Sequence, residues 1–400
     1  MVVAGASLGG LRAAEQLRGA GWSEEIVVVG DEPHMPYNRP PLSKEVLAGK
    51  APFDSLAFRP RASAADVLWR LGTAVVSADL DARAVTLDDG SQLAFDGLVV
   101  ATGMRPRRLR CPGPQGPRSG RHTVRTLSDA EGLRAELTRP GARVVVVGAG
   151  FIGCEVAATA RGLGVADVTV VDPEPLPMLR PLGELLATAL LERHRARGVR
   201  FALGRTVAGF EGEDRVTGVV LSDGTVLPAD VVVEAVGSIA NTEWLEGNGL
   251  DLADGVLCDE QLRVQGMPHV VAVGDVARFP NARYDGVPRR VEHWSIPTDT
   301  AKHAARTLLA GLAGAPVDSP PFAPLPSFWS DQFEYRLQSF GAPALGTADA
   351  RVLDGDPAGD LLVGYHVQDR LVGVVALGGP AAVAGAARYR ARLTAPPVGV

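Results

Sequence analysis

VVAGASLGG at residues 2–10 and RVVVVGAGFIG at residues 143–153 are the stretches that determine the fold of this 400-residue chain. Each contains an apolar strand, a glycine turn and the start of a helix, and each is followed by a second apolar strand ending in acid, IVVVGDE at 26–32 and VTVVD at 168–172. Parallel strands joined by a helix bring a strand end and a helix N-terminus together, where backbone N–H groups and the helix dipole bind a pyrophosphate. The sequence therefore predicts two βαβ units that each bind one dinucleotide.

The glycine turns supply the first predicted cofactor-binding residues. These are Gly5, Ser7 and Gly10 in the first turn and Gly148, Gly150 and Gly153 in the second. An acid about 20 residues beyond the last glycine can accept hydrogen bonds from an adenosine ribose. Glu32, beside Asp31, has this spacing in the first unit, and Asp172 has it in the second.

Asp172 predicts which nicotinamide dinucleotide is used. A carboxylate at this strand end accepts from the ribose 2′-OH and repels a 2′-phosphate, whereas an NADP site would have an arginine nearby. The next residues, PEPLPML at 173–179, are acidic or apolar, and Arg180 comes only after them. NADH is therefore favoured over NADPH.

Composition excludes several other classes of protein. Apolar residues make up 46% and charged residues 22%, so the chain should fold into globular domains. A net charge of -6 offers no basic surface for a nucleic-acid partner. The longest uncharged run, residues 371–387, contains four glycines and Pro380, so it predicts a short strand, a turn and an Ala-rich helix and not a membrane span.

Cysteine and histidine are not placed for metal binding or redox chemistry. Cys111, Cys154 and Cys258 lie far apart without a CxxC pair, and the histidines do not cluster at ligand spacing. Free thiols of this kind fit a reducing compartment. The N-terminus has no basic segment or cleavage signal, so we expect a cytoplasmic protein without a metal site.

Further segments extend the two units. GLVVATG at 97–103 and HVVAVGDVA at 269–277 run from apolar residues to a small-residue end, as buried parallel strands do. Proline- and glycine-rich linkers lie at 104–120 and 311–327. Hairpin strands after the second linker, broken by Gly–Asp and Gln–Asp–Arg turns, predict a small α+β C-terminal domain.

Seven pieces, in the same order along nearly the whole chain, resemble one family. They are PYNRPPLSK (36–44), ATG (101–103), the second glycine motif with Glu155, NTEWLEGNGL (241–250), VAVGDVARFPN (271–281), VEHWS (291–295) and FWSDQ (328–332). The chain is thereby similar to the FAD- and NAD(P)H-dependent ferredoxin reductases that serve cytochrome P450 and Rieske oxygenase systems. In that family the first unit binds FAD, the second binds the nicotinamide dinucleotide, and a C-terminal domain covers the flavin.

The resemblance implies an α/β fold with two Rossmann-like dinucleotide-binding domains and a small α+β C-terminal domain. The FAD-binding domain would comprise residues 1–112 and 236–318, and the NAD-binding domain residues 113–235. The C-terminal reductase domain would comprise residues 319–400.

Lys44 and Glu155 are the predicted catalytic residues. Only three of the 40 basic residues are lysine, at positions 44, 50 and 302, so Lys44 is distinctive even though it could be a surface residue. The resemblance places Lys44 beside the flavin N5, where a cation would favour the negatively charged reduced flavin. It also pairs Lys44 with Glu155, for which the alternative is an acid in the first helical turn that complements the helix dipole.

The remaining cofactor-binding residues also come from the resemblance. Asp275 would accept from the ribityl hydroxyls of FAD, although an Asp after a strand can simply form a turn. Arg39 would bind FAD phosphate or ribose unless it is a surface arginine. The resemblance adds four residues near the flavin, with burial in the core as the alternative for the tryptophans: Thr102, Gly103, Trp294 and Trp329.

Three positions depart from the family pattern. Ser7 replaces the middle glycine of the first turn, but serine is small and keeps the backbone donors. Asn38 stands where the family often has Asp. Ile296–Pro297 stands where the family usually has Asn–Ala, at the start of the helix aimed at the flavin pyrimidine edge; proline suits a first helical turn because its missing N–H would be unpaired there.

The sequence is therefore interpreted as an FAD-dependent NADH:ferredoxin reductase that passes electrons to an acidic [2Fe–2S] ferredoxin. Arg289 and Arg290 are candidates for docking that transient partner. Flavin disulfide reductases and NADH peroxidases share the scaffold but need a cysteine near the flavin, and residues 36–44 contain none. A rubredoxin acceptor, or a flavoprotein that senses NADH and acts as an interaction partner, remains an alternative.

Overall fold

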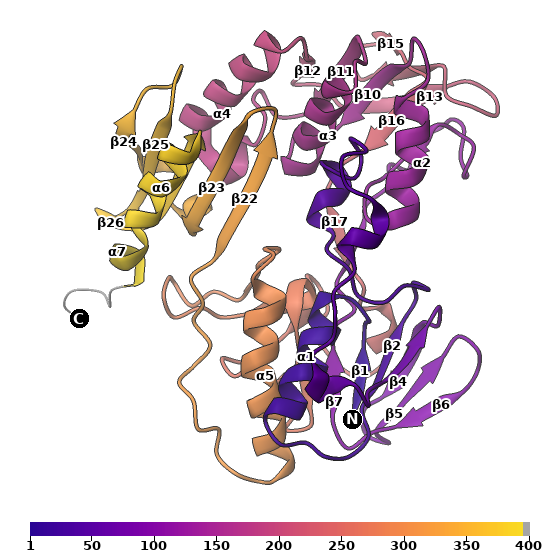
Figure 1. Cartoon of the computed structure of the whole chain (residues 1–400), viewed down its shortest axis with the longest axis vertical. Coiled ribbons are helices and arrows are strands. Elements are labelled where there is room, and N and C mark those ends of the chain that lie inside the picture. Colours follow the sequence, from indigo (N-terminus) through magenta and orange to yellow (C-terminus); the bar gives the residue numbers. More distant parts are fainter. Residues whose placement is uncertain (395–400) are drawn as a thin grey trace. The chain divides into compact units, whose positions relative to one another are not determined.

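The computed structural model describes residues 1–394 (Figure 1). The chain folds into two compact units, each made of three segments. Unit 1 comprises Met1–Asn38, Leu56–Arg105 and Ile239–Pro326, and unit 2 comprises Arg39–Ser55, Pro106–Ser238 and the chain from Ser327 onward. The predicted domain boundaries stay a prediction, and residues 395–400 of the predicted C-terminal domain lie outside the described residues.

Unit 1 is built on a parallel sheet with the strand order β19-β7-β1-β2-β3. Its strands are β1 (Val2–Ala4), β2 (Val27–Gly30), β3 (Leu68–Leu71), β7 (Leu98–Val100) and β19 (Val270–Ala272). The two further runs predicted as buried parallel strands form β7 and β19, so that prediction is confirmed. Ala4 is opposite Val100, and Val100 is opposite Ala272, so three strands end at one edge of the sheet.

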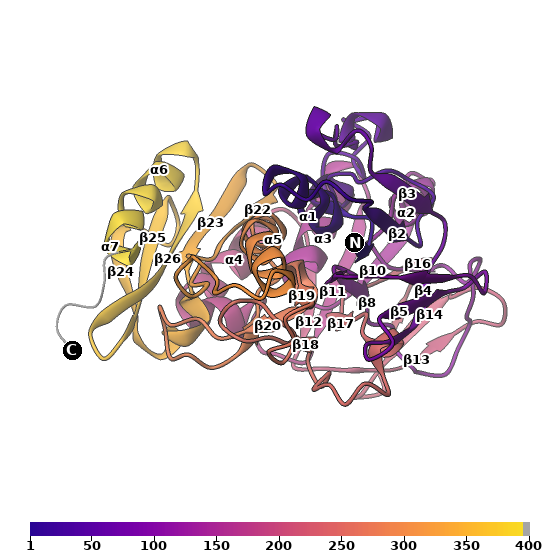
Figure 2. The same cartoon turned by 90° about the horizontal axis from the view of Figure 1, so that it is seen from below.

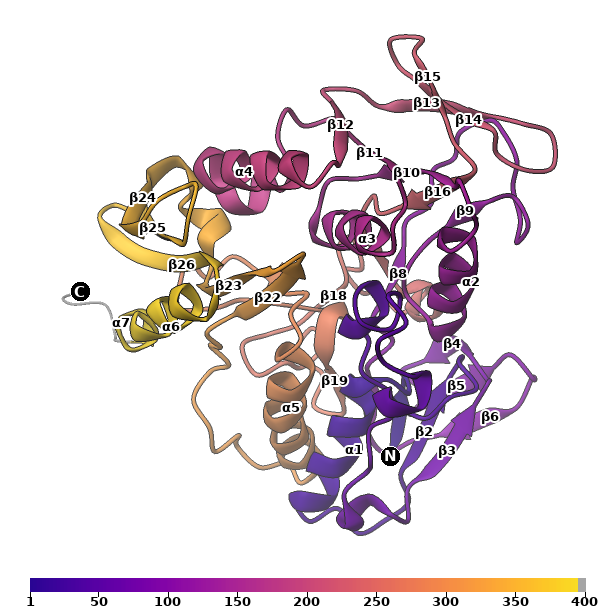
Figure 3. The ribbon, with the colours of Figure 1, turned by 45° about the horizontal axis from the view of Figure 1, so that its top comes forward.

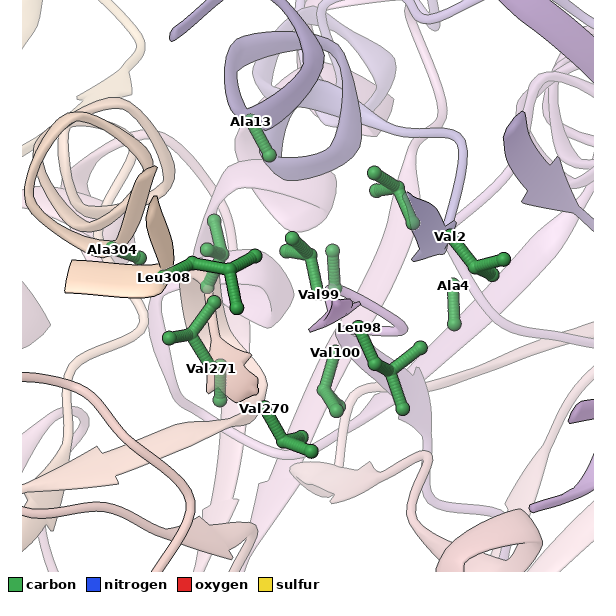
Figure 4. Close-up of a cluster of buried hydrophobic side chains, with 14 of the residues drawn as sticks. Val2, Ala4, Ala13, Leu98, Val99, Val100, Val270, Val271, Ala304 and Leu308 are labelled. Atoms are coloured by element: carbon green, nitrogen blue, oxygen red, sulfur yellow. The ribbon is translucent and has the colours of Figure 1, made fainter. Parts of the chain in front are cut away.

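Two helices of unit 1, α1 (Leu8–Gly19) and α5 (Ile296–Leu312), pack side by side (Figure 3). Figure 4 shows side chains of β7 and β19, such as Val99 and Val271, beside Ala13 of α1 and Leu308 of α5. All four side chains are buried. This apolar core holds the strand ends in register, so the turns that follow them have fixed positions.

Smaller elements complete unit 1. One antiparallel sheet contains β4 (Val75–Asp79), β5 (Ala84–Leu87) and β6 (Gln92–Ala94). A mixed sheet contains β18 (Val256–Leu257), β20 (Ala277–Phe279) and β21 (Arg289–Arg290), with β20 parallel to β18 and antiparallel to β21. The 3-10 turn η5 (Gly274–Val276) follows β19. Strands β8 (Met104–Pro106) and β17 (Ser238–Ala240) lie where the chain passes from one unit to the other.

Unit 2 contains a second parallel sheet, with the strand order β12-β11-β10-β16-β9. Its elements are β9 (Arg121–His122), α2 (Leu127–Leu137), β10 (Arg143–Val147), α3 (Phe151–Gly162), β11 (Asp167–Asp172), α4 (Leu179–Ala196), β12 (Arg200–Leu203) and β16 (Val231–Glu234), with a separate sheet of β13 (Val207–Glu211), β14 (Gly218–Leu221) and β15 (Val226–Pro228). Val147 is opposite both Val171 and Glu234, so these strand ends share an edge.

The C-terminal part of unit 2 is an antiparallel sheet with the order β22-β23-β26-β25-β24. It comprises β22 (Ser327–Gln332), β23 (Tyr335–Gly341), β24 (Ala350–Gly355), β25 (Leu361–Val367) and β26 (Arg370–Gly378). Helix α6 (Pro380–Arg388) packs on this sheet and α7 (Arg390–Thr394) follows it (Figures 1 and 2). The predicted fold class, two Rossmann-like units with a small α+β C-terminal part, is confirmed.

Close backbone approach demands glycine at matching places in the two units. A Cβ on Gly10 would lie 1.9 Å from the backbone oxygen of Gly5, and a Cβ on Gly153 would lie 1.9 Å from that of Gly148. Gly5 and Gly148 themselves adopt positive φ angles of 121° and 107°. Each helix therefore starts against the preceding strand end in a geometry that only glycine permits.

The middle position of the turn is different. A Cβ on Gly150 would meet no atom within 4 Å, and its φ of -78° is open to any residue. Ser7 occupies the matching position in unit 1, also with a negative φ, of -104°. The protein backbone does not require glycine here, which explains why the first turn accepts serine.

We expect Gly153→Ala to lower the free energy of unfolding by about 2 kcal/mol, because the new methyl group would overlap the Gly148 oxygen. Gly150→Ala in the same turn is the matched control, and its stability without cofactor should stay within about 0.5 kcal/mol of wild type. Urea unfolding followed by circular dichroism measures both. Equal stabilities of the two variants would contradict the proposed packing constraint.

Candidate functional site

The carboxyl edge of the unit 1 sheet gathers residues predicted to bind FAD. Gly5 follows β1, the pair Thr102–Gly103 comes after β7, and Asp275 comes after β19. Because these strands are parallel and in register, the three turns lie next to one another. The structure thus brings the predicted residues of three separate sequence segments to one edge.

Thr102 is tied to the segment that begins at Asn241. Its hydroxyl donates to the backbone oxygen of Asn241 at 2.7 Å, and Asn241 Nδ2 donates to the backbone oxygen of Thr102 at 2.9 Å. The backbone N–H of Asn241 also donates to the oxygen of Gly103 at 3.0 Å. These bonds shape the turn after β7, while direct cofactor binding by Thr102 and Gly103 stays a prediction.

Glu32 and Trp294 are each held by a neighbour in unit 1. Tyr37 donates its hydroxyl proton to Glu32 Oε2 at 2.6 Å. Glu32 is half-buried whereas Asp31 is exposed, which favours Glu32 as the ribose acceptor. Trp294 donates from Nε1 to Asn38 Oδ1 at 2.9 Å and is 41% exposed, so the alternative of a core aromatic is wrong for Trp294.

Asp275 lies in η5, in a turn that packs against the start of α5. Gly274 adopts a φ of 78°, and its N–H donates to Thr300 Oγ1 at 2.9 Å. Ile296 is the fully buried first residue of α5, and Pro297 follows it in the first turn, where no N–H is needed. The Ile–Pro departure is therefore accommodated by the packing of this helix start.

Asp172 is anchored to the glycine turn of unit 2. Its Oδ2 accepts from the N–H of Ala149 at 2.6 Å, and its Oδ1 accepts from the N–H of Glu174 at 2.8 Å. Carboxylate oxygens have more than one acceptor site, so ribose hydroxyls can still bind. The structure brings Asp172 to the same sheet edge as Gly148 and Gly150.

The arginines near Asp172 form ion pairs with other acidic residues. Arg180 donates from Nε to Glu174 at 2.7 Å, and Arg205 pairs with Asp223 at 2.5 Å. Arg205 is close to Asp172, since its backbone N–H donates to the Asp172 oxygen. Neither guanidinium is therefore a ready partner for a 2′-phosphate.

Lys44 and Glu155 form an ion pair within unit 2. Lys44 Nζ lies 2.6 Å from Glu155 Oε2, with side-chain exposures of 11% and 3%. Lys44 follows the 3-10 turn η1 (Pro40–Ser43), and Glu155 is the fifth residue of α3. The first turn of α3 contains no acid, so the alternative role of Glu155 as a dipole-complementing first-turn acid is wrong.

Two serines complete the environment of the Glu155 carboxylate. Ser43 donates to Oε2 at 2.5 Å, and Ser330 of β22 donates to Oε1 at 2.6 Å. Thr159, one turn along α3, donates to the backbone oxygen of Ser43 at 2.8 Å. Sequence reasoning missed both serines, although they stand inside the family pieces PPLSK and FWSDQ, where the signal was available.

Arg39 and Trp329 belong to unit 2. Arg39 is half-buried and donates from Nη1 to the backbone oxygen of Arg125 at 2.8 Å. Trp329 is half-buried on β22, opposite Gln338 of β23. Their roles in cofactor binding stay predictions.

The three cysteines all lie within the described residues and are free, and two of them, Cys154 and Cys258, are buried. Cys154 is fully buried, and its Sγ lies 3.6 Å from the Ala149 oxygen. Burial raises the pKa of the Cys154 and Cys258 thiols, so neither forms a thiolate readily. Cys111 is half-buried, with its Sγ 3.5 Å from the oxygen of Val207.

The arginines predicted to dock an acidic partner are paired within unit 1. Arg289 bonds both carboxylate oxygens of Asp285, at 2.5 Å and 2.7 Å, and this lowers the pKa of Asp285 to about 2. Arg290 pairs with Asp254 at 2.8 Å and with Glu292 at 2.7 Å. Two arginines facing three acids make no basic patch at this position.

The residues at both glycine turns suit a bound dinucleotide. Neither α1 nor α3 has an acid in its first turn that would repel a pyrophosphate, and a Cβ on Gly150 would meet no protein atom within 4 Å.

Across residues 1–394, no helix is both long and apolar enough to cross a membrane. Over the same residues, His, Cys, Asp and Glu side chains form no group that could hold a metal ion.

Comparisons with known proteins agree along the whole chain. Residues 1–301 match the family described as pyridine nucleotide-disulphide oxidoreductase, and residues 327–397 match the family described as reductase C-terminal. The chain is 39% identical to putidaredoxin reductase of Pseudomonas putida over 348 residues, which are 85% of this chain and 80% of that protein.

Two further matches cover still more of the chain. The ferredoxin–NAD(+) reductase component of the p-cumate 2,3-dioxygenase system of Pseudomonas putida is 36% identical over 392 residues, 97% of this chain and 92% of that protein. The crystal structure of the covalent putidaredoxin reductase–putidaredoxin complex matches with a TM-score of 0.89 and 36% identity, covering 98% of this chain and 92% of that one. The chain therefore belongs to the ferredoxin reductases of the pyridine nucleotide-disulphide oxidoreductase family, flavoproteins that use FAD and NAD(H).

Proposed function

We propose that this ferredoxin reductase takes electrons from NADH and passes them to a [2Fe–2S] ferredoxin that serves a cytochrome P450 or a Rieske oxygenase. The observation that carries the proposal is a buried Lys44–Glu155 pair in a chain whose three cysteines are all free, two of them buried where their thiols stay protonated. Electrons that enter from NADH therefore need an acceptor outside the chain. The names of the two relatives, a putidaredoxin reductase and a dioxygenase component, support this class of acceptor.

The roles of the charged pair follow from its surroundings. Bound FAD supplies the conversion of one electron pair into two single electrons. Lys44 supplies a largely buried positive charge, which is worth more in a low-dielectric site than in water. Glu155 holds the Lys44 ammonium, and the Ser43 and Ser330 hydroxyls hold the carboxylate in turn.

Asp172 gives the preference for NADH in this proposal. Its carboxylate is fixed at the sheet edge by two backbone N–H groups, so it offers a rigid negative charge to the adenosine ribose. The nearby Arg180 and Arg205 are neutralised by their own acids. A 2′-phosphate would meet net negative charge here.

We expect the purified chain to carry FAD and to be reduced about tenfold or more faster by NADH than by NADPH, because of the like-charge repulsion at Asp172. Asp172→Asn should narrow that ratio by about tenfold. Asp167→Asn, at the other end of β11 and paired with Arg200, is the matched control. Stopped-flow absorbance of the flavin measures the rates. Equal rates of wild-type reduction by NADH and NADPH would contradict the role proposed for Asp172. A chain that cannot be reconstituted with FAD would contradict the proposed function.

Glu155→Gln and Lys44→Ala should each slow flavin reduction by NADH by about tenfold or more while FAD stays bound, because each removes a charged hydrogen-bond partner. The double variant should be no slower than the worse single variant, since both residues act through one interaction. Lys50→Ala, an exposed lysine of the same segment, is the control. Mild and additive effects of the two substitutions on the reduction rate would contradict the catalytic role and indicate that Lys44 and Glu155 only stabilise the structure.

Reduction of cytochrome c by NADH should rise strongly when a matched [2Fe–2S] ferredoxin is added, and should fall at high salt if charge steers the encounter. The assay uses ferredoxins and rubredoxins from the same source organism, with glutathione disulfide and hydrogen peroxide as competing acceptors. Efficient turnover of disulfide or peroxide without any ferredoxin effect would favour a disulfide reductase or peroxidase. Binding of NADH without turnover of any acceptor would favour an NADH-sensing role.

A further inference from the structure

Strand β22 carries two buried polar side chains on one of its faces. Along a strand alternate residues share a face, so Phe328, Ser330 and Gln332 point the same way. Phe328 contacts the ring of Phe151 at the start of α3, with ring centroids 4.8 Å apart. Ser330 and Gln332 are each only 1% exposed, and a buried polar side chain is costly unless it is hydrogen-bonded.

Hydrogen bonds connect this face to Glu155 on one side and to His194 of α4 on the other. Ser330 donates to Glu155 Oε1 at 2.6 Å, and Gln332 Nε2 donates to Ser330 Oγ at 3.0 Å. Gln332 Oε1 lies 2.7 Å from His194 Nε2. Four residues from three elements of unit 2, namely α3, α4 and β22, therefore form one continuous chain of bonds.

The direction of every bond in the chain is fixed from its carboxylate end. An ionised carboxylate only accepts, so the Ser330 hydroxyl must donate to Glu155. The Ser330 oxygen then accepts from the Gln332 amide N–H, which leaves Gln332 Oε1 as the atom facing His194. His194 must therefore donate from Nε2.

The surroundings of His194 keep its imidazole neutral, with the proton on Nε2. The ring is fully buried and lies edge-on to Phe201, Phe333 and Tyr335. Its Nδ1 has no hydrogen-bond partner in the described chain, so a proton there would have no acceptor. Burial lowers the pKa of His194 to about 4, against the opposing effect of the Gln332 bond, and the imidazole stays neutral with its one N–H at Nε2.

We propose that His194, Gln332 and Ser330 are positioning residues, a one-way hydrogen-bond relay that fixes the Glu155 carboxylate and thereby the place of the Lys44 ammonium. Oε1 is committed to the relay, so Oε2 is the oxygen left for Lys44 and Ser43. Without the relay the carboxylate could rotate about its terminal torsion, which has broad minima, and Lys44 would lose its fixed partner. This inference rests on the proposed function for its effect on rate, but not for its effect on Lys44.

The kinetic test uses Gln332→Met, which keeps most of the volume and removes both bonds of Gln332. We expect flavin reduction by NADH to slow by about fivefold, which corresponds to the usual net contribution of one hydrogen bond between neutral groups, with the dissociation constant of NADH nearly unchanged. Asp331→Asn is the matched control, because Asp331 points to the other face of β22 and pairs with Arg336. In a Lys44→Ala background Gln332→Met should have no further effect on the rate.

A second test needs no turnover. With only three lysines in the chain, ¹³C-labelled lysine gives three ε-carbon NMR signals, assigned by Lys50→Arg and Lys302→Arg. The Lys44 signal should shift in Gln332→Met and in His194→Phe, which keeps an aromatic ring but loses the donor, and should not move in Asp331→Asn. Ser330→Ala, the smallest change, replaces Gln332→Met if that variant does not fold.

The outcomes separate the relay from the function. An unshifted Lys44 signal and an unchanged reduction rate in the relay variants, even with a lowered melting temperature, would overturn the relay and leave the residues as packing. A wild-type protein that NADH does not reduce would overturn the proposed function, while the NMR shifts would still decide the relay.

Discussion

The burial of the Glu155 carboxylate is the constraint on which the organisation of unit 2 depends. A buried charge is tolerated only when it is paired and its remaining acceptors are filled. Lys44 and Ser43 come from the segment Arg39–Ser55, and Ser330 comes from the C-terminal sheet. Satisfying one carboxylate thus draws together α3, a segment more than a hundred residues before it and a strand far after it. Together with Leu47, which is buried in the apolar core of unit 2, these bonds fasten Arg39–Ser55 to unit 2, although both neighbouring segments belong to unit 1.

The two parallel sheets meet a second constraint in the same way. Each helix must start within bonding distance of the strand that precedes it, and the resulting contacts exclude a side chain at Gly10 and Gly153. In unit 2, a Cβ on the middle residue of the turn, Gly150, would meet no protein atom within 4 Å, so what binds there limits the size of this residue. Ser7 and Gly150 both have negative φ angles, so the exchange of glycine for serine is not a difference in how the backbone folds.

The secondary structure around the glycine turns and in the C-terminal sheet could be predicted from short stretches of sequence. The glycine turns, the strands after them and the hairpins of the C-terminal sheet follow from alternation, apolar runs and turn residues within about ten positions. The Lys44–Glu155 pair came from family resemblance, because residues so far apart carry no local signal. Gln332 and His194 were not predicted at all, since their roles exist only once β22 and α4 are packed together.

Charge was predicted least well, and for a physical reason. Arg289 and Arg290 look basic in sequence, but a four-residue turn returns Asp285 to Arg289, and Asp254 reaches Arg290 from a distant segment. A count of arginines gives formal charge, whereas docking depends on the charge left after pairing. Any electrostatic attraction of a ferredoxin must therefore come from other groups than these two.

Neighbouring residues on α3 contrast the charge pair with a buried thiol. Cys154 directly precedes Glu155, but adjacent residues on a helix point about 100° apart. Glu155 faces the polar network, while Cys154 faces the core, where burial keeps the thiol protonated. Moving the thiol into reach of substrate would require turning the helix and breaking the pair. The same helix geometry that presents Glu155 to Lys44 therefore keeps the Cys154 thiol out of disulfide exchange, which agrees with the proposal that electrons leave through an acceptor that docks from outside.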